Sequence, residues 1–415
     1  MRRIVFNGRF LAQPLTGVQR YGLETLRALD RLLGREPALR RGAVWQLALP
    51  HDAADPPLLD HFEIRVLPIF RGHLWEQVTL AAFAHGAYLV NPGYSGPLFQ
   101  RAQMITVHDA GLRANPQTYA WRYRLFADTL LSVLLPRVDT VATVSAFSAR
   151  ELARHHGLQR NDLLVCRNGW EHVRADGDDG AVLRRHGLAS GGYLLAVGSL
   201  KANKNFGVIP QALQLLDDIA LPPLAVVGAT DTRVYRGVEP LPDTKARLLG
   251  PVPDDELHAL YRHAAWFIFP SIYEGFGLPP LEAMANGCPV LAAEAAAIPE
   301  VCGDAALYFD PHDPASLAAR LREVLTQPDP QALRRTLAQR ALARLAIYRW
   351  DANARIVRDR LVAVGAVAAG EADHPRSAFG APPQGGAAGG PAQPDPRRLV
   401  DAPVHAGVPF GEVER

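Results

Sequence analysis

The 415-residue sequence lacks the features that mark several large classes of protein. It has three cysteines, Cys166, Cys288 and Cys302, which lie far apart and form no CxxC pair. This argues against a disulfide framework or a zinc site and fits a reducing cytoplasm. No apolar run approaches the ~20 residues that a membrane-spanning helix needs. We also expect no signal peptide, because Asn7 and Arg9 interrupt the apolar stretch that it would require.

A strong charge of either sign is also missing. The chain has 44 Lys and Arg residues against 42 Asp and Glu residues, for a formal net charge of +2. This balance argues neither for nor against nucleic acid, and we expect no nucleic-acid partner. Hydrophobic residues make up 48% and charged residues 21%, as in an ordinary soluble globular protein. Because single cores stop growing near ~250–300 residues, we predict two domains.

Short aliphatic or β-branched runs alternate with amphipathic helical stretches along most of the chain. The runs are mostly apolar rather than alternating, as expected for parallel strands covered on both faces. In the first half the predicted strands are Arg3–Phe6, Val44–Leu49, Ile64–Leu67, Tyr88–Val90, Ile105–His108, Thr140–Ser145 and Leu163–Cys166. In the second half they are Tyr193–Val197, Leu224–Val227, Arg247–Leu249, Trp266–Phe269, Val290–Ala292 and Ala306–Phe309. These βα units predict an α/β protein with two Rossmann-like, doubly wound parallel sheets.

The seam between the two domains is predicted between Asn168 and Gly192, where ADGDDG and SGG have turn and linker composition. The N-terminal domain is then 1–172, the linker 173–191 and the C-terminal domain 192–348. Each sheet should bind ligands beyond the carboxyl ends of its strands, so two facing sheets would form an interdomain cleft.

Two segments remain after these domains. A helix at about 349–366 has no strand left to serve in the second half of the chain. From 370 to 415 the chain is rich in Gly, Pro and Ala. Because such a segment buries too little apolar surface to offset its ordering entropy, we expect it to be disordered. It is either an inert tail or a partner-binding one.

The most informative stretch begins at Pro270 and reads PSIYEGFGLPPLEAMANGCPVLA. It predicts a strand, a glycine loop and a helix from about Pro280 to Asn286, with Gly287 as the C′ residue. Such a loop turns backbone N–H groups toward the positive end of a helix dipole. This arrangement suits an anion such as a diphosphate.

Two glutamates lie in this stretch, Glu274 in the loop and Glu282 in the first turn of the predicted helix. Glu282 is placed to accept two hydrogen bonds from a vicinal diol such as a ribose. The alternative is a surface helix whose N-terminal carboxylate is merely favoured by the dipole. The candidate loop residues between the glutamates are Gly275, Phe276, Gly277 and Leu278.

The combined pattern resembles the Glu-x7-Glu signature of retaining glycosyltransferases of the GT-B fold, in the large family 4. The glutamate spacing, the GFGLP loop and the following EAMANGCPV match together, from a chain that resembles the family from Arg3 to about Val364. The resemblance implies an acceptor-side N-terminal domain and a C-terminal domain that binds the nucleotide sugar. It assigns the donor sugar to Glu274 and the ribose to Glu282. It also implies that the helix at 349–366 crosses back onto the N-terminal domain.

A basic loop, VGSLKANKN, follows the predicted strand Tyr193–Val197. The resemblance assigns Lys204 to the donor diphosphate, where a compact charge also suits the negative charge that grows as the sugar leaves. The chain departs from the commoner Arg-Lys pair, because Asn203 precedes Lys204. Either Lys201 replaces the lost charge or the diphosphate is held less tightly. Ser199, Lys201 and Asn203 are donor-binding candidates, with a solvated loop as the alternative.

Three N-terminal segments also match the family. Gly17, in LTGVQRYGLETLRAL, matches a glycine that lets the backbone approach the nucleotide phosphates, although a plain helix start explains it equally well. His108, in ITVHDAG, lies at the carboxyl end of a strand and corresponds to a histidine beside the donor sugar. A histidine satisfied by local hydrogen bonds is the alternative. Ser145 or Ser148, in TVSAFSARELA, is predicted to cap a helix.

Glu274, His108 and Lys204 are therefore the catalytic candidates. A glycoside hydrolase would need a second carboxylate across the cleft, and only Asp109 is available. The resemblance implies instead a front-face displacement in which the leaving phosphate helps to take the acceptor proton. It also implies no metal or other cofactor, and no DxD-like motif ends a predicted strand.

The opening FNGRFLAQPLTGVQRYGLETL and the ITVHDAG segment look most like the mannosyltransferase branch that acts on O-antigen and exopolysaccharide. We therefore expect transfer of a hexosyl group, best mannosyl from GDP-mannose, to a lipid-linked oligosaccharide or polysaccharide acceptor. A UDP-sugar donor is the alternative within the class. A sugar-nucleotide epimerase is disfavoured by the glutamate loop, and a non-catalytic scaffold by the presence of all three catalytic candidates. A dehydrogenase would need a GxGxxG after its first strand, which this chain lacks.

The stretch from Tyr119 to Val138 combines Trp121, Arg122 and Arg124 with a Leu-rich face. It suits contact with an anionic bilayer, as in peripheral enzymes with lipid-linked acceptors. It suits equally a core helix with a solvated arginine edge. We expect a cytoplasmic protein, with peripheral contact at the inner membrane as the open alternative.

Overall fold

The computed structural model describes residues 2–54, 56–159, 163–173, 179–199, 201–228 and 246–367. The chain divides into one unit at Met1–Gly370 and a second at Glu371–Arg415. The predicted tail at 370–415 and residues 174–178 of the predicted linker lie outside the described residues.

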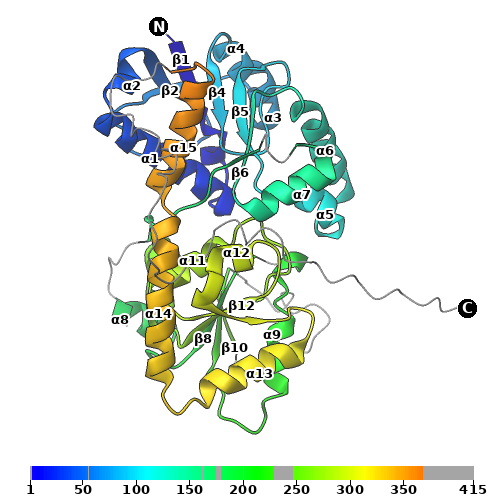
Figure 1. The fold of residues 1–415 in the computed structure, drawn as a ribbon, viewed down its shortest axis with the longest axis vertical. Helices are drawn as coiled ribbons and strands as arrows, with labels where there is room; N and C mark the ends of the chain where they lie inside the picture. The colour runs from blue at the N-terminus through cyan, green and yellow to red at the C-terminus, as the bar shows by residue number, and fades with distance from the viewer. Residues whose placement is uncertain are drawn as a thin grey trace, which may run out of the picture. The chain divides into compact units, whose positions relative to one another are not determined.

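The described residues form two parallel sheets, which confirms the predicted α/β class (Figure 1). The first sheet has the order β3-β2-β1-β4-β5-β6-β7, and the second has the order β10-β9-β8-β11-β12-β13. The strands of the first are β1 Arg2–Asn7, β2 Ala43–Pro50, β3 Glu63–Leu67, β4 Tyr88–Asn91, β5 Gln103–Thr106, β6 Thr140–Thr143 and β7 Leu163–Val165. Those of the second are β8 Leu194–Val197, β9 Leu224–Val227, β10 Ala246–Gly250, β11 Trp266–Phe269, β12 Val290–Ala293 and β13 Ala306–Phe309.

Each predicted strand coincides with one of these strands, apart from its ends. β5 stops at Thr106 and β6 at Thr143, so His108 and Ser145 lie just beyond the strands rather than within them. The strands β4, β5, β6, β9, β11 and β12 are buried along their whole length, as the apolar runs predicted. By contrast, β3 is largely exposed because it is an edge strand.

The strand order places the candidate loops. In each sheet the chain reverses its direction of travel beside the first strand, between β1 and β4 and between β8 and β11. Ligands of doubly wound sheets bind at the carboxyl ends of the strands at such a switch point. The loop that carries Lys204 follows β8, and the loop that carries Glu274 follows β11. Both therefore belong to the switch point of the second sheet.

Helices cover these sheets, with short 3-10 or π segments between them. The helices are α1 Gly17–Arg35, α2 Ala38–Arg41, α3 Gly72–Leu74, α4 Ala81–Phe83, α5 Gly111–Ala114, α6 Trp121–Leu134, α7 Ala146–His156, α8 Asp179–Arg185, α9 Val208–Gln214, α10 Asp254–His263, α11 Leu278–Ala285, α12 Ile298–Cys302, α13 Pro314–Leu325, α14 Pro330–Ile347 and α15 Trp350–Ala363. The short segments are η1 Gly8–Ala12, η2 Trp75–Leu80, η3 Pro116–Thr118, η5 Ala202–Lys204 and η7 Gly303–Ala305. Asp313 caps α13 by accepting a hydrogen bond from the Ala315 N–H.

The last described helix, α15, packs along α1 of the first half of the chain (Figure 1). Asp351 accepts hydrogen bonds from Arg31 at 2.9 Å and from Arg35 at 2.7 Å. Asn353 lies 3.4 Å from Thr25 in the buried part of this contact. The C-terminal helix therefore lies against the helix that follows β1.

Candidate active site

The glycine loop begins directly after β11 and ends at α11, whose range is Leu278–Ala285. The predicted start at Pro280 was wrong by two residues, because both prolines lie inside the first turn, where no N–H is needed. Gly277 precedes the helix with φ of 101°, a conformation that favours glycine. Gly287 follows it as the predicted C′ residue. Because the helix starts early, Glu282 lies in its second turn rather than its first.

Gly275 brings this loop against the segment that follows β5. A Cβ at Gly275 would lie 2.2 Å from the carbonyl oxygen of His108, so only glycine fits. Ser145 caps α7 as predicted and also donates its hydroxyl to the Gly275 carbonyl at 2.6 Å. The Ser148 hydroxyl lies 2.9 Å from the carbonyl oxygens of both Gly275 and His108. The two serines therefore join loops from the two halves of the chain.

Glu274 and Lys204, both predicted to be catalytic, lie together. The Lys204 ammonium donates to Glu274 Oε1 at 2.6 Å. Their side chains are only 15% and 17% exposed, so water screens this pair less than it screens a surface ion pair. The ammonium also lies 5.7 Å from the centre of the Phe269 ring. One fixed cation is thus placed beside the loop carboxylate.

The His108 ring is held by one hydrogen bond and one aromatic contact. Its Nε2 lies 2.9 Å from the Pro92 carbonyl oxygen, and its ring packs edge-on against Tyr21 at 4.9 Å. Because a carbonyl can only accept, Nε2 carries the proton and Nδ1 is left as an acceptor. Burial lowers the pKa of His108 to about 4. The local hydrogen bond that was the alternative explanation is therefore present, and Nδ1 remains for other contacts.

Asp109, the next residue, interacts electrostatically with Glu274 in the second half of the chain. Its Oδ1 accepts a hydrogen bond from the Gly111 N–H at 2.7 Å. Burial raises the pKa of Asp109, and the negative charge of Glu274 raises it further. The two carboxylates are therefore close enough to interact.

Glu282 is buried and already has partners. Its Oε1 lies 3.0 Å from His172 Nε2, and its Oε2 lies 3.5 Å from the Tyr261 hydroxyl. It is therefore not the solvated surface carboxylate that was the alternative. His172, at the end of the N-terminal domain as predicted from sequence, was not expected to belong to the site.

In the basic loop after β8, Asn203 makes structural hydrogen bonds, whereas Ser199 and Lys201 are exposed. Asn203 donates its amide to the Tyr273 carbonyl at 3.0 Å, and its own carbonyl accepts from the Ile272 N–H at 2.9 Å. It therefore fixes the backbone directly before Glu274. Ser199 is exposed, and Lys201 is exposed and lines a cavity described below.

The remaining donor-binding candidates differ in what they offer. A Cβ on Gly17, the first residue of α1, would meet no atom within 4 Å, so no protein neighbour requires this glycine. Phe276 and Leu278 are buried, and Phe276 packs edge-on against Tyr348 at 5.3 Å. These two side chains shape the loop, and only their backbone groups are left to face a ligand.

A polar cavity of about 360 Å³ lies at the switch point of the first sheet. Its walls come from the segments after β1 and β4, from α1, and from α3 with the adjoining π-helix η2. Lys201 adds a cation from the second half of the chain. The lining residues are Asn7, Arg9, Phe10, Gln13, Thr16, Val18, Gln19, His73, Glu76, Pro92, Gly93, Tyr94, Ser95, Tyr123 and Lys201.

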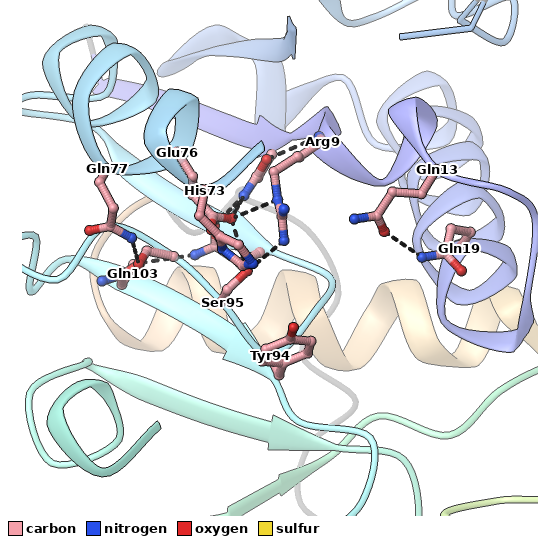
Figure 2. Close-up of polar contacts among 12 residues, drawn as sticks. Arg9, Gln13, Gln19, His73, Glu76, Gln77, Tyr94, Ser95 and Gln103 are labelled. Atoms are coloured by element: carbon pink, nitrogen blue, oxygen red, sulfur yellow. Dashed lines mark hydrogen bonds and ion pairs between the residues drawn. The ribbon is translucent and has the colours of Figure 1, made fainter. Parts of the chain in front are cut away.

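Glu76, in the π-helix, is the centre of this cavity's polar network. Its side chain is 1% exposed and is surrounded by donors, as Figure 2 shows. Asn7 donates to Oε1 at 2.9 Å and Ser95 at 3.1 Å, and Arg9 Nε lies 3.4 Å from the same oxygen. Burial alone would raise the pKa of Glu76, but these contacts and His73 outweigh it and hold the pKa below its usual range. Glu76 is therefore an ionised carboxylate.

The residues of this network were not predicted from the sequence. Arg9, Glu76 and Ser95 are far apart along the chain. Arg9 lies in the opening segment that resembles the family but was not singled out there, and Glu76 and Ser95 lie in no segment that was. A π-helix is often associated with function, but its extra residue per turn leaves no sequence pattern that could have revealed it.

Helix α6, from the stretch Tyr119 to Val138, has a buried half and an exposed half. Its second half packs into the core through Leu131 and Leu134. Its first half exposes Trp121 at 64% and Leu125 at 62%. The exposed part adjoins a groove of about 490 Å³, which is mostly apolar.

Two kinds of feature were not found in the part of the chain that the structure describes. No helix there is long and apolar enough to cross a bilayer. No group of three or more His, Cys, Asp or Glu residues there is arranged to hold a metal ion.

The glutamate loop and the basic loop lie within a region that matches a known family model. Residues 191–327 match the model of glycosyl transferases group 1. The O-antigen chain mannosyltransferase B of Escherichia coli is 30% identical over 379 residues, which cover 84% of this chain and 96% of that protein. The O-antigen chain mannosyltransferase RfbU of Salmonella typhimurium is 28% identical over 254 residues, 60% of this chain and 68% of that protein.

Solved structures with the same fold include two glycosyltransferases of low sequence identity. Sucrose-phosphate synthase from Thermosynechococcus elongatus aligns with a TM-score of 0.65 at 17% identity, over 88% of this chain and all of that one. WaaG, a glycosyltransferase of lipopolysaccharide biosynthesis, aligns with a TM-score of 0.59 at 16% identity, over 86% and 99%. The expected GT-B fold is confirmed by these neighbours. Since the Escherichia coli relative is matched almost from end to end, this chain belongs to the glycosyl transferases group 1 family and is a glycosyltransferase of the GT-B fold.

Proposed function

We propose that this protein is a retaining, metal-independent mannosyltransferase that uses GDP-mannose and extends a lipid-linked oligosaccharide or polysaccharide of the cell surface. The observation that carries the proposal is the Lys204–Glu274 pair, held at 2.6 Å on a loop that touches His108 across the two halves of the chain. The names of the relatives, two O-antigen chain mannosyltransferases, support mannose as the transferred sugar.

The donor lies between the basic loop and the N-terminus of α11. Lys204 supplies the positive charge for the diphosphate, and the helix dipole behind Gly277 adds to it. Glu282 accepts hydrogen bonds from the ribose diol, and Glu274 faces the sugar. The charge that a metal ion would otherwise provide comes from these groups, so we propose no metal.

In the reaction the bond between the anomeric carbon and the diphosphate oxygen breaks. A bond from the acceptor hydroxyl oxygen to the same carbon forms on the same face, which retains the configuration. The acceptor proton passes to the leaving diphosphate. The protein contributes position and electrostatic stabilisation rather than a nucleophile, which is the work suited to a fixed Lys204 and a neutral His108.

The acceptor saccharide binds in the polar cavity around Glu76. Hydroxyl-rich sugars need donors and acceptors in close alternation, and the cavity offers both (Figure 2). Arg9 and Gln19 donate, and the Glu76 carboxylate accepts. Tyr94 and Tyr123 add apolar ring surface for a sugar face. Lys201, from the same loop as Lys204, lines this cavity, which supports an acceptor position next to the proposed reaction centre.

We propose that the exposed half of α6 contacts the cytoplasmic face of the membrane, beside a lipid-linked acceptor, and the exposure of Trp121 and Leu125 supports this. Trp121 and Leu125 enter the interface, and the adjacent Arg122 and Arg124 pair with anionic headgroups. Replacing Trp121 and Leu125 by serine should weaken sedimentation with anionic vesicles and leave transfer to a soluble acceptor unchanged. Equal vesicle binding by both proteins would remove this part of the proposal.

A donor panel tests the proposal as a whole. GDP-mannose should raise the Tm of the purified protein more than UDP-glucose, UDP-galactose or dTDP-glucose, because a ligand that binds the native state stabilises it. Transfer of labelled mannose should continue in EDTA and should give a product with retained anomeric configuration. A larger response to a UDP-sugar would favour the alternative donor class, for which the structural neighbour HepE, solved with UDP-glucose, is a precedent. Loss of activity on chelation, restored by Mn²⁺, would refute metal independence.

A further inference from the structure

A carboxylate recognises a diol only if its plane is held in one orientation, because free rotation would spread its acceptor lone pairs over many directions. Glu282 is hydrogen-bonded to His172, and His172 is in turn hydrogen-bonded to Trp350. His172 Nε2 lies 3.0 Å from Glu282 Oε1, and the Trp350 indole nitrogen lies 3.1 Å from His172 Nδ1. All three side chains are buried. They come from α11, from the segment after β7, and from the first residue of α15.

The Trp350 indole fixes the direction of both hydrogen bonds in the series Trp350–His172–Glu282. An indole N–H can only donate, so His172 Nδ1 must accept and carries no proton. The single ring proton of a neutral imidazole is then on Nε2, where it donates to the Glu282 carboxylate. The other tautomer would point a lone pair at the carboxylate, and the doubly protonated ring would set its Nδ1 proton against the indole proton. Trp350 therefore selects the one form of His172 that can hold Glu282.

We propose that His172, set in this form by Trp350, is a positioning residue that fixes the Glu282 carboxylate for the donor ribose. The inference rests on the proposed function, in which Glu282 binds the ribose diol. With Oε1 held by His172, Oε2 and the remaining lone pair of Oε1 present one geometry to the two hydroxyls. The Tyr261 hydroxyl, at 3.5 Å from Oε2, is too distant to hold the carboxylate by itself.

This arrangement gives α15 a part in donor recognition. The Trp350 ring also packs 6.1 Å from Tyr21, which in turn packs edge-on against His108. Trp350, at the start of α15, is thus connected through His172 to Glu282 and through Tyr21 to His108.

The test compares two probes, GDP and 2′,3′-dideoxy-GDP, which lacks the diol, by isothermal titration. The same pair of UDP compounds is used if GDP does not bind. Wild type should prefer the natural ribose by about tenfold or more, the size expected for hydrogen bonds to a charged group. H172A should lose most of this preference, as E282Q does, by weakening the binding of GDP while leaving that of the dideoxy compound nearly unchanged. H172Q, whose amide can still donate, should keep part of the preference, and W350F should show a smaller loss of the same kind.

Glu171 provides a matched control. Its carboxylate accepts from the Trp350 backbone N–H at 2.9 Å and from Arg349 at 2.6 Å, so it holds the same junction without touching Glu282. E171Q should lower the Tm and keep the ribose preference. If H172A proves unfolded, H172Q and W350F carry the test.

The outcomes separate this inference from the function on which it rests. A loss of preference in E282Q alone, with H172A and W350F like wild type, refutes the positioning role and leaves the ribose role intact. An equal weakening of both probes in H172A also refutes it, because a general structural role would act on both. Full preference in E282Q refutes the ribose role and this inference with it. Failure of wild type to bind any of the four nucleotides refutes both as well.

Discussion

The two halves of this glycosyltransferase build their polar sites in opposite ways. In the second half, Glu274 and Glu282 lie on one continuous loop and helix after β11, and Lys204 joins them from the neighbouring strand end. In the first half, the Glu76 network is assembled from a π-helix and from the segments after β1 and β4. Under the proposed function, the second-half site binds a diphosphate and a ribose, which every nucleotide sugar contains, so one compact segment can supply the contacts. The Glu76 network, which we propose for the acceptor saccharide, draws its contacts from side chains that are scattered along the sequence.

The ion pairs of the two sites differ in their burial and in the number of hydrogen-bond partners that surround the carboxylate. The side chains of Lys204 and Glu274 are 17% and 15% exposed and pair at 2.6 Å, and Glu274 has no further side-chain donor among the hydrogen bonds of the described residues. Glu76 is 1% exposed and has Asn7, Ser95 and Arg9 around it. Changes at Glu274 should therefore act on activity with little effect on folding. Changes around Glu76 should act on both.

The largest effect is expected at the donor site. E274Q removes the charge that we propose faces the sugar and keeps the side-chain shape, so kcat should fall by about 10²–10³-fold, as for other groups that stabilise a transition state electrostatically. The Tm should change little. Transfer assays and thermal melts measure both, with the exposed Glu294 replaced in E294Q as the control. An E274Q enzyme with wild-type kcat would remove Glu274 from the catalytic site.

The next largest effect is expected when the buried Arg9–Glu76 ion pair in the first half of the chain is broken. R9M leaves the Glu76 charge buried without its cation and should cost about 2–3 kcal/mol of folding free energy, less than the ~3–5 typical of a broken buried pair because Asn7 and Ser95 remain. The double variant R9M/E76Q should regain part of that free energy in urea unfolding. Its KM for the acceptor should stay high while its KM for the donor is unchanged. A raised donor KM instead would contradict the division between the two sites.

Two glycines sharpen the comparison further. G275A places a Cβ against the His108 carbonyl, so it should destabilise the protein by about 1–3 kcal/mol through overpacking and should lower activity as the loops separate. G17A meets no protein atom and should leave the Tm unchanged. If donor phosphates approach the start of α1, G17A should still raise the donor KM. Identical effects of the two substitutions on Tm would show that the loop contact is not tight.

Lys201 belongs to the second half of the chain but lines the cavity of the first. If it replaces the missing arginine at the diphosphate, K201A should weaken donor binding by about 1–3 kcal/mol, the cost of leaving a charged partner unpaired. If it serves the cavity, the acceptor KM should rise and donor affinity should change by no more than ~0.5 kcal/mol. Asn203 gives the contrast, since N203A removes the clamp on Tyr273 and should lower kcat through Glu274. Titration of GDP-mannose and acceptor kinetics distinguish these results.

The smallest effect concerns pH. Burial lowers the pKa of His108 to about 4, whereas an unfolded histidine titrates near ~6.5. Between these values the unfolded chain binds a proton that the folded protein does not, so stability falls as the pH drops from about 6.5 toward 4 and is fully present above. H108N should therefore lose less Tm than wild type between about pH 7 and pH 5. His156, whose pKa burial also lowers to about 4, should leave a residual pH dependence in H108N. Equal losses in the two proteins would show that His108 is not held neutral.

Much of the fold could be read from local pattern. Apolar runs of strand length separated by turn residues located each strand of both sheets to within a few residues. The errors occurred at ends, where tertiary contacts decide. α11 begins at Leu278 rather than Pro280, because the chain turns at Gly277, and β5 stops before His108, because that segment leaves the sheet to meet Gly275.

The candidate site divides along the same line. Glu274, Glu282 and Lys204 became candidates because the two loops that carry them resemble contiguous motifs of the family. Asn203 was placed near the donor, but its hydrogen bond to Tyr273 depends on how two loops meet. The hydrogen bonds that link Glu282 to His172 and His172 to Trp350 were not predicted at all. His172 and Trp350 are separated by most of the second half of the chain, and neither residue type implies the other.

The sequence by itself determined two parallel sheets and their strand positions, since each depends on residues within a few turns of one another, and the family resemblance supplied Glu274 and Glu282 as candidates. Only the tertiary structure decided that Glu76 is a buried, ionised centre of a cavity, that Gly275 touches His108, and that a tryptophan of α15 selects the tautomer of His172. The physical reason is that hydrogen bonds between side chains depend on distances of a few tenths of an ångström. Those distances are set by the packing of elements that are remote in sequence, so no local pattern records them.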